Sequence, residues 1–138
     1  MAKTRSRYLL DTNICIYIAK GRPLAVRHRF EAHTLQELAM STITVGELRF
    51  GAEKSQFKER TLATIDQLVQ MIQPCALPMH AAHHYGQVRA VLERQGLPIG
   101  NNDLWLAAHA LAEGWTLVTN NTREFSRVPD LKVENWAE

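Results

Sequence analysis

Residues 99–121, with the sequence IGNNDLWLAAHALAEGWTLVTNN, constrain the fold more than any other stretch of the chain. Asn101 or Asn102 can cap a new helix through a side-chain oxygen. Apolar residues then recur at helical spacing, and Gly114 suits the left-handed conformation that ends a helix. Residues 116–119 follow as a short apolar, β-branched run without alternation, which is typical of a strand covered by helices on both faces. The stretch therefore predicts a helix that packs directly against a buried parallel strand.

Strand and helix signals alternate along the whole chain. Short apolar runs predict strands at residues 8–10, 38–42, 74–77, 116–119 and 131–133. Helical spacing predicts helices at residues 14–20, 23–33, 43–54, 56–72 and 79–95, a further helix that begins near 101, and a helical turn at 122–125. This order predicts an α/β fold in three α/β/α layers, with a mostly parallel central sheet between helices. We expect a single domain over residues 1–138, because no repeat or linker interrupts it.

The composition is that of a globular protein rather than of a disordered chain or a membrane protein. Hydrophobic residues make up 46% of the chain and charged residues 22%. No apolar run approaches the roughly 20 residues of a membrane span, and the first residues do not form an apolar export signal. We therefore expect a cytoplasmic protein without a membrane partner. Of the two cysteines, Cys15 lies in an apolar stretch and is expected to be a small core residue rather than half of a disulfide.

The net charge of +2 conceals an uneven distribution. Residues 1–60 carry eleven Lys or Arg against six Asp or Glu, whereas residues 61–138 carry five against eight. Basic side chains early in the chain could lie along a polyanion, but composition alone favours ordinary solvated charges. The residues concerned are Lys3, Arg5, Arg7, Lys20, Arg22, Arg27 and Arg29.

Three acidic residues are expected at one edge of the predicted sheet. Asp11 ends the first strand, Glu47 lies in the first helical turn after the second strand, and Asp103 lies at the start of a later helix. The carboxyl ends of parallel strands line the crevice in which ligands bind. Gathered carboxylates repel one another unless a divalent cation lies among them, and oxygen ligands without His or Cys suit Mg²⁺ or Mn²⁺. The pattern predicts a metal-binding, phosphodiester-cleaving site.

Two of these acids also have simpler structural explanations. Glu47 follows Thr44 at the spacing of a capping box, and Asp103 is favoured at the positive end of its helix dipole. Asp11 has no such explanation, because a carboxylate that ends a buried strand is costly without a partner. Because all three acids are expected at the same edge of the sheet, we favour a common metal-binding site over three separate structural roles.

Three segments of the chain resemble the motif blocks of VapC toxins, which are PIN-domain ribonucleases of type II toxin–antitoxin modules. The segments are YLLDTN, STITVGELRFGAEKS and IGNNDLWLAAHALAEGWTLVTNNTREFSRVPDLKVENW. The resemblance covers nearly the whole chain and implies that Asp11, Glu47 and Asp103 are the catalytic acids. It implies further that Asp11 and Asp103 are the direct ligands of Mg²⁺, with Asn13 and Thr119 on polar positions of the same pocket.

The sequence departs from the wider PIN pattern at one position. Many PIN domains carry a fourth acid after the fourth strand, where this chain has Asn121, and the nearest carboxylate is that of Glu124. An amide orients water but brings no charge. A second metal ion therefore depends on Glu124, which can equally be a solvated charge on a helical turn.

The resemblance also implies an activity and partners. VapC toxins cleave RNA, often tRNA, and so inhibit translation. By similarity the chain is expected to form a homodimer and to bind a VapB-like antitoxin in a larger hetero-oligomer, with operator DNA bound through the antitoxin. Two alternatives remain open: a catalytically silent PIN domain that binds RNA or a partner, and a phospho-receiver domain, which also has an acidic Mg²⁺ pocket.

Other residues suggest chemistry but are expected to be structural. The imidazoles in residues 80–84 have zinc-like spacing but lack the glutamate of a zincin motif, so we interpret them as a helix surface. His109 lies away from Asp103 on the helical wheel and is expected to be packed or interfacial rather than a general base. Trp105 can stack on a base, but we expect it at a dimer interface.

Overall fold

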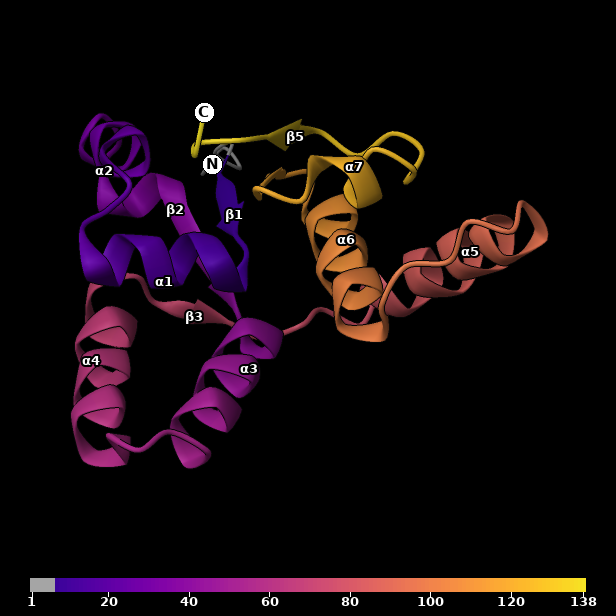
Figure 1. Ribbon diagram of the computed structural model, residues 1–138. Coiled ribbons are helices and arrows are strands. Elements are labelled where there is room, and N and C mark those ends of the chain that lie inside the picture. Colours follow the sequence, from indigo (N-terminus) through magenta and orange to yellow (C-terminus); the bar gives the residue numbers. More distant parts are fainter. Residues whose placement is uncertain (1–6) are drawn as a thin grey trace.

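The chain forms a five-stranded parallel sheet in which β1 occupies the centre of the order β3-β2-β1-β4-β5 (Figure 1). The computed structural model describes residues 7–138. The strands are β1 (Tyr8–Leu10), β2 (Leu38–Ser41), β3 (Pro74–Cys75), β4 (Thr116–Val118) and β5 (Val133–Glu134). The helices are α1 (Thr12–Lys20), α2 (Leu24–Glu31), η1 (Leu35–Glu37, a 3₁₀ turn), α3 (Thr42–Glu53), α4 (Lys58–Met71), α5 (Ala81–Arg94), α6 (Asn101–Glu113) and α7 (Thr122–Phe125). The predicted fold class and the predicted order of elements are confirmed.

Helices cover both faces of the sheet, as the short apolar strands predicted. Side chains alternate along each strand, so Leu9 and Leu10 of β1 enter two different cores. Leu10 packs with residues of α1, α2, α3 and α4, whereas Leu9 packs with residues of α5, α6 and α7. Figure 1 shows these two groups of helices on opposite sides of the strands. Leu9 and Leu10 of β1 are fully buried between them, so the residue that follows Leu10 lies at the centre of the carboxyl edge of the sheet.

The structure corrects several predicted boundaries. The cap of α6 is Gly100, which makes no side-chain hydrogen bond, so neither Asn101 nor Asn102 caps this helix. The third strand was predicted at residues 74–77 but pairs only at Pro74–Cys75, beside β2 at the edge of the sheet. The turn η1 was not predicted. It contains only three residues and is stabilised by a capping box between Thr34 and Glu37. Short elements of this kind carry too few residues for a periodic signal.

The order of the strands excludes a phospho-receiver fold. Receiver domains have the order 2-1-3-4-5, in which the first strand lies between the second and the third. In this chain β1 lies between β2 and β4 instead, and β3 lies at the outer edge. The signalling alternative is therefore wrong.

One early basic residue, Arg7, makes contacts within the domain. The guanidinium of Arg7 donates hydrogen bonds to the carbonyl oxygens of Gln36 (3.2 Å) and Leu38 (2.8 Å) and lies over the ring of Trp115. Its charge is therefore not part of a polyanion surface, while Lys3 and Arg5 lie outside the described residues. Cys15 is buried and unbridged, as expected. No helix within residues 7–138 has both the length and the apolar character required to cross a bilayer.

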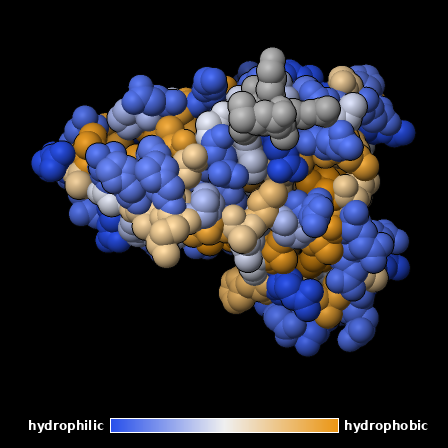
Figure 2. Space-filling model, turned by 180° about the vertical axis from the view of Figure 1, so that it is seen from behind, coloured by the Kyte–Doolittle hydropathy of each residue, from blue (hydrophilic) through white to orange (hydrophobic). Residues whose placement is uncertain are grey.

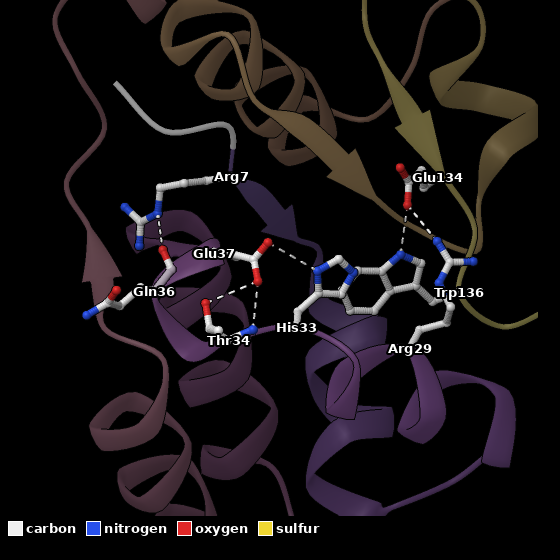
Figure 3. A network of polar contacts seen from close by, with 8 residues as sticks. All are labelled: Arg7, Arg29, His33, Thr34, Gln36, Glu37, Glu134 and Trp136. Carbon is white, nitrogen blue, oxygen red and sulfur yellow. Dashed lines mark hydrogen bonds and ion pairs between the residues drawn. The ribbon is translucent and has the colours of Figure 1, made fainter. Parts of the chain in front are cut away.

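A stacked aromatic pair holds the C-terminal segment against the loop that follows α2 (Figure 3). The ring of Trp136 is fully buried and lies parallel to the imidazole of His33, with 5.1 Å between ring centroids. Its indole N–H donates to Glu134 (3.1 Å), and the same carboxylate pairs with Arg29 (2.8 Å). These contacts join residues about a hundred positions apart in the sequence.

We expect Trp136→Phe to lower the free energy of unfolding by about 1–2 kcal/mol. The smaller ring leaves a void in the core and removes the hydrogen bond to Glu134. Urea titration followed by circular dichroism measures the change. Trp105→Phe is the matched control, because Trp105 is only half-buried and phenylalanine keeps its stacking on Tyr85. If both substitutions lowered the free energy of unfolding equally, the contacts of Trp136 would not stabilise the fold more than those of a half-buried surface tryptophan.

Candidate active site

Asp11 lies immediately after the central strand and caps α1. Its Oδ1 accepts the backbone N–H of Ile14 at 2.9 Å, and its carboxylate also accepts the hydroxyl of Thr119 at the end of β4. Only 6% of the residue is exposed. Burial raises the pKa of the Asp11 carboxyl, and the charge of Glu47 raises it further, while the hydrogen bonds oppose this shift. The expectation that Asp11 lacks a structural explanation is wrong, because its side chain caps α1. Burial nevertheless makes ionisation of its carboxyl costly, as expected for an acid that ends a buried strand.

Glu47 lies in the second turn of α3, and two side chains from other helices hold it. Thr12 donates its hydroxyl to Oε1 at 2.5 Å, and Asn102 donates its amide to Oε2 at 3.3 Å. The suggested capping box with Thr44 is wrong, because α3 begins earlier, with Ser41 as its cap. The carboxylate of Glu47 therefore has no capping role, and it lies close enough to Asp11 and Asp103 to raise the pKa of both.

Asp103 is the third residue of α6 and is half-buried. Its pKa is raised to about 6, first by burial and then by the negative charges of Glu47, Glu124 and Asp11. Several carboxylates therefore oppose the ionisation of one another at this point. Such a group favours the uptake of either protons or a cation.

The three predicted acids line one cleft of about 170 Å³ at the carboxyl edge of the sheet. The cleft is lined by Asp11, Thr12, Asn13, Glu47, Asp103, Leu106, Asn121 and Phe125. Thr119 lies behind it, where its hydroxyl contacts the carboxylate of Asp11. The fold thus brings together acids that are separated by 36 and 56 positions in the sequence.

Asn121 and Glu124 form a pair at the rim of this cleft. The amide of Asn121 donates to Oε2 of Glu124 at 3.0 Å, and its backbone N–H donates to the hydroxyl of Thr119 at 2.9 Å. Glu124 is half-buried, and its charge raises the pKa of Asp103. Glu124 therefore lies close to the acidic cleft and is not simply a solvated surface charge.

Sequence reasoning missed two polar residues of the site, Thr12 and Asn102. Both hold Glu47, but their partners lie 35 and 55 positions away in the sequence. The only available signal was the adjacency of Thr12 to Asp11 and of Asn102 to Asp103. The sequence suggests Asn102 only as a candidate cap of α6, a role that it does not have.

The donor set fits a hard divalent cation held largely by water. Within residues 7–138, no three His, Cys, Asp or Glu side chains form a completed metal cage. Mg²⁺ does not require one, since it keeps several waters and is usually bound through one or two carboxylates. Asp11 and Asp103 supply two carboxylates whose pKa values are raised first by burial and then by neighbouring negative charge, and a bound cation would offset both effects. The residues present thus fit Mg²⁺ better than a fully protein-ligated metal.

The other singled-out residues lie apart from the cleft. His109 is fully buried, and its Nδ1 lies 3.0 Å from the hydroxyl of Ser41, so the expectation of a packed histidine is confirmed. Trp105 stacks on Tyr85 of α5 with ring centroids 3.9 Å apart, and its placement at a dimer interface stays a prediction. The rings of His80, His83 and His84 pack against one another at the start of α5.

The parallel sheet order and the acidic cleft at its carboxyl edge define a class of nuclease domain. The sequence model of the PIN domain family matches residues 8–131. The chain is 47% identical over 131 residues to the tRNA(fMet)-specific endonuclease VapC of Shigella flexneri, covering 95% of this chain and 98% of that protein. It is also 47% identical to the ribonuclease VapC2 of Haemophilus influenzae, with 94% and 98% coverage.

Solved structures give the same result. A chain of DNA-bound VapBC from Salmonella typhimurium superposes with a TM-score of 0.89 at 41% identity, covering 96% of this chain and 99% of that one. VapBC2 from Rickettsia felis, bound to a promoter DNA fragment, gives a TM-score of 0.86 at 40% identity, with 94% and 98% coverage. The chain belongs to the PIN domain family and, within it, to the VapC ribonucleases.

Proposed function

We propose that the protein is the toxin of a type II toxin–antitoxin module and a metal-dependent endoribonuclease that cleaves tRNA. The cleft that joins Asp11, Glu47 and Asp103 carries this proposal, because gathered carboxylates can hold the divalent ion that assists hydrolysis of a phosphodiester. The name of the Shigella relative supports tRNA as the substrate. The proposal includes a single catalytic domain over residues 1–138 that acts in the cytoplasm.

The three acids of the cleft have distinct roles in this proposal. Asp11 and Asp103 hold Mg²⁺, for which Mn²⁺ can substitute, and when bound the ion supplies positive charge at the phosphodiester and lowers the pKa of a bound water. Glu47, held by Thr12 and Asn102, orients the attacking water and accepts its proton. Catalytic roles for all three acids are proposals that rest on their common cleft.

The remaining polar residues support these acids. Thr119 fixes the carboxylate of Asp11 through a hydrogen bond. Asn13 lines the cleft, and in this proposal its amide donates a hydrogen bond to a phosphate oxygen of the RNA. Asn121 holds Glu124 near Asp103, so the two residues together take the place of the fourth acid of other PIN domains. A second ion would then depend on Glu124.

The partners follow from the solved relatives, which are VapBC complexes and in two cases contain DNA. We propose that a VapB-like antitoxin binds this chain, blocks the acidic cleft and carries the complex to operator DNA. A groove of about 430 Å³ between α1, α3 and α4 suits a segment of this antitoxin, because it is largely apolar and shares Thr12 and Glu47 with the cleft. We further propose that the chain forms a homodimer within the hetero-oligomer.

We expect Mg²⁺ to bind about tenfold more weakly at pH 5 than at pH 7. The pKa of Asp103 is raised to about 6, so at pH 5 this ligand is mostly protonated and a proton must leave before the ion binds. Isothermal calorimetry with MgCl₂ and MnCl₂ measures the affinity at both pH values. In Asp103→Asn the affinity should be weak at both values, and the pH dependence should be smaller, because the proton that Asp103 takes up is no longer involved.

The same titration separates the nuclease from a catalytically silent PIN domain. A silent domain should show no metal binding that depends on Asp103, and no metal-dependent cleavage of tRNA by the purified protein. Sequencing the ends of RNA fragments after brief induction identifies the substrate and the cleaved bond. Cleavage that continues undiminished in EDTA would contradict the metal-dependent mechanism.

A further inference from the structure

A second groove, of about 620 Å³, opens from the acidic cleft and follows the outer face of α3. It shares Thr12 and Glu47 with the cleft and has Asn102 at its rim. From Glu47 it continues past Phe50 and Lys54, which follow at intervals of three and four residues and so lie on one face of the helix. In Figure 1, α3 and α4 form a hairpin that projects from the body of the domain. The groove thus leads from the acids out along a projecting helix.

Phe50 and Lys54 form an exposed pair of an aromatic ring and a cation. The side chain of Phe50 is 65% exposed, and Nζ of Lys54 lies 4.7 Å from the centre of its ring. Within residues 7–138, Lys54 makes no ion pair, whereas Lys58 and Arg49 of the same hairpin are paired with Glu53 and Asp66. The projecting hairpin carries hydrophobic surface among hydrophilic side chains (Figure 2). The groove therefore offers an open aromatic face and an unpaired positive charge.

Gly46 keeps the groove open beside Glu47. A glycine inside a helix costs about 1 kcal/mol relative to alanine, and a Cβ at this position would meet no atom of the chain within 4 Å. Packing within the domain therefore gives no reason for the missing side chain. The space that it leaves lies on the exposed side of α3, next to the proposed catalytic acids.

We propose that the groove along α3 binds the single-stranded RNA segment adjacent to the cleaved phosphodiester, with a base stacked on Phe50 and a phosphate at Lys54. The inference rests on the proposed nuclease function, since RNA that lies across the cleft must leave it along a neighbouring surface. An aromatic face beside a cation is the combination that binds single strands without strict sequence preference. An antitoxin segment is the competing occupant, and the experiments separate the two.

The first test measures binding of a short, fluorescently labelled, mixed-sequence single-stranded RNA to the full chain in EDTA, which prevents metal-dependent cleavage. We expect Phe50→Ala to weaken binding by about five- to a hundredfold. Phe50→Leu should weaken it almost as much, because leucine keeps apolar volume but has no ring, whereas Phe50→Tyr should bind like the wild type. Phe57→Ala is the matched control, since Phe57 is 63% exposed beneath Arg60 but does not line the groove.

The second test measures the dependence of RNA affinity on salt. A phosphate contact by Lys54 predicts that Lys54→Ala lowers the slope of log affinity against log salt concentration by about 0.7, the value for one contact to a single strand. Phe50→Ala should leave this slope unchanged, because stacking releases no counterions. Lys58→Ala is the control, since Glu53 already neutralises Lys58.

The third test fills the groove. Gly46→Leu should weaken RNA binding and raise KM for tRNA cleavage, while the midpoint of thermal unfolding rises because leucine favours the helix. Gly86→Leu in α5, where a Cβ likewise meets no atom within 4 Å, should change stability similarly without changing RNA affinity. A loss of binding in a more stable protein cannot be attributed to misfolding.

The outcomes separate this proposal from the proposed function. If wild-type protein cleaves tRNA but the Phe50, Lys54 and Gly46 variants bind RNA normally, the groove proposal is overturned and the nuclease remains. If the same variants instead lose inhibition by the co-expressed antitoxin, and Phe50→Leu retains it, the groove belongs to the antitoxin and the proposal is equally overturned. If the variants change RNA binding as predicted but the wild-type protein cleaves no RNA, the RNA-binding role of the groove is supported and the proposed nuclease function is overturned.

Discussion

Replacing Asp11 by asparagine is expected to reduce RNA cleavage by about 100- to 1,000-fold without unfolding the protein. The amide keeps an oxygen that accepts the N–H of Ile14, so the cap of α1 survives. It removes one of the two carboxylates that we assign to Mg²⁺. Because burial raises the pKa of the Asp11 carboxyl, the neutral side chain should not lower stability at neutral pH. Single-turnover cleavage of tRNA, with the unfolding midpoint measured in parallel, checks both parts.

A surface acid provides the matched control for this substitution. Asp66 lies on α4 in a long, exposed pair with Arg49, 4.0 Å apart, and Asp66→Asn should cleave RNA at the wild-type rate. In cells, Asp11→Asn should abolish growth arrest on induction, whereas Asp66→Asn should not. Purified Asp11→Asn that cleaved RNA as fast as the wild type would remove the central acid from the mechanism.

His109 is expected to make the protein sensitive to acid. Its imidazole is fully buried, and desolvation lowers its pKa from 6.5 to about 4. The unfolded chain therefore takes up a proton at this residue first, and the folded state loses stability as the pH falls from about 6.5 toward 4. The full loss is about 2–3 kcal/mol, which is a large part of the stability of a domain of this size. Urea titrations at pH 7 and pH 4 measure it.

The substitution His109→Asn isolates this contribution. Asparagine places a polar atom near the position of Nδ1, which contacts the hydroxyl of Ser41, but it does not titrate. The difference in unfolding free energy between wild type and variant should therefore shrink or reverse as the pH falls. Asp103 acts in the opposite direction, since its raised pKa favours the folded state at lower pH, and it contributes equally in both proteins. A difference that stays constant from pH 7 to pH 4 would contradict a buried, neutral His109.

The contact between His109 and Ser41 also connects two helices of the site. Ser41 caps α3, which carries Glu47, and His109 belongs to α6, which carries Asp103. Ser41 accepts the N–H of Ile43 at 3.1 Å, so its hydroxyl oxygen serves the cap and the histidine together. Protonation of His109 is therefore expected to disturb the relative position of two of the acids as the protein loses stability.

The sequence by itself determined the class of fold and the location of the acids. Apolar runs at residues 8–10 and 116–119 have no alternation, and this is a local property that identifies buried strands before any partner is known. Asp11 directly follows one such run, so its place at the carboxyl edge follows from the same pattern. The resemblance to VapC toxins added the roles of Glu47 and Asp103, which spacing alone left open.

Tertiary structure alone decided what surrounds these acids. The hydrogen bonds of Thr12 and Asn102 to Glu47, the inward-facing guanidinium of Arg7 and the pairing of Trp136 with His33 all join residues from different elements. Periodicity along a chain reports which face of an element is buried, but not which side chain of another element lies opposite. The identity of each partner, and with it the raised pKa of Asp103, is set by how the helices pack on the sheet, because charge and hydrogen bonding act across space rather than along the sequence.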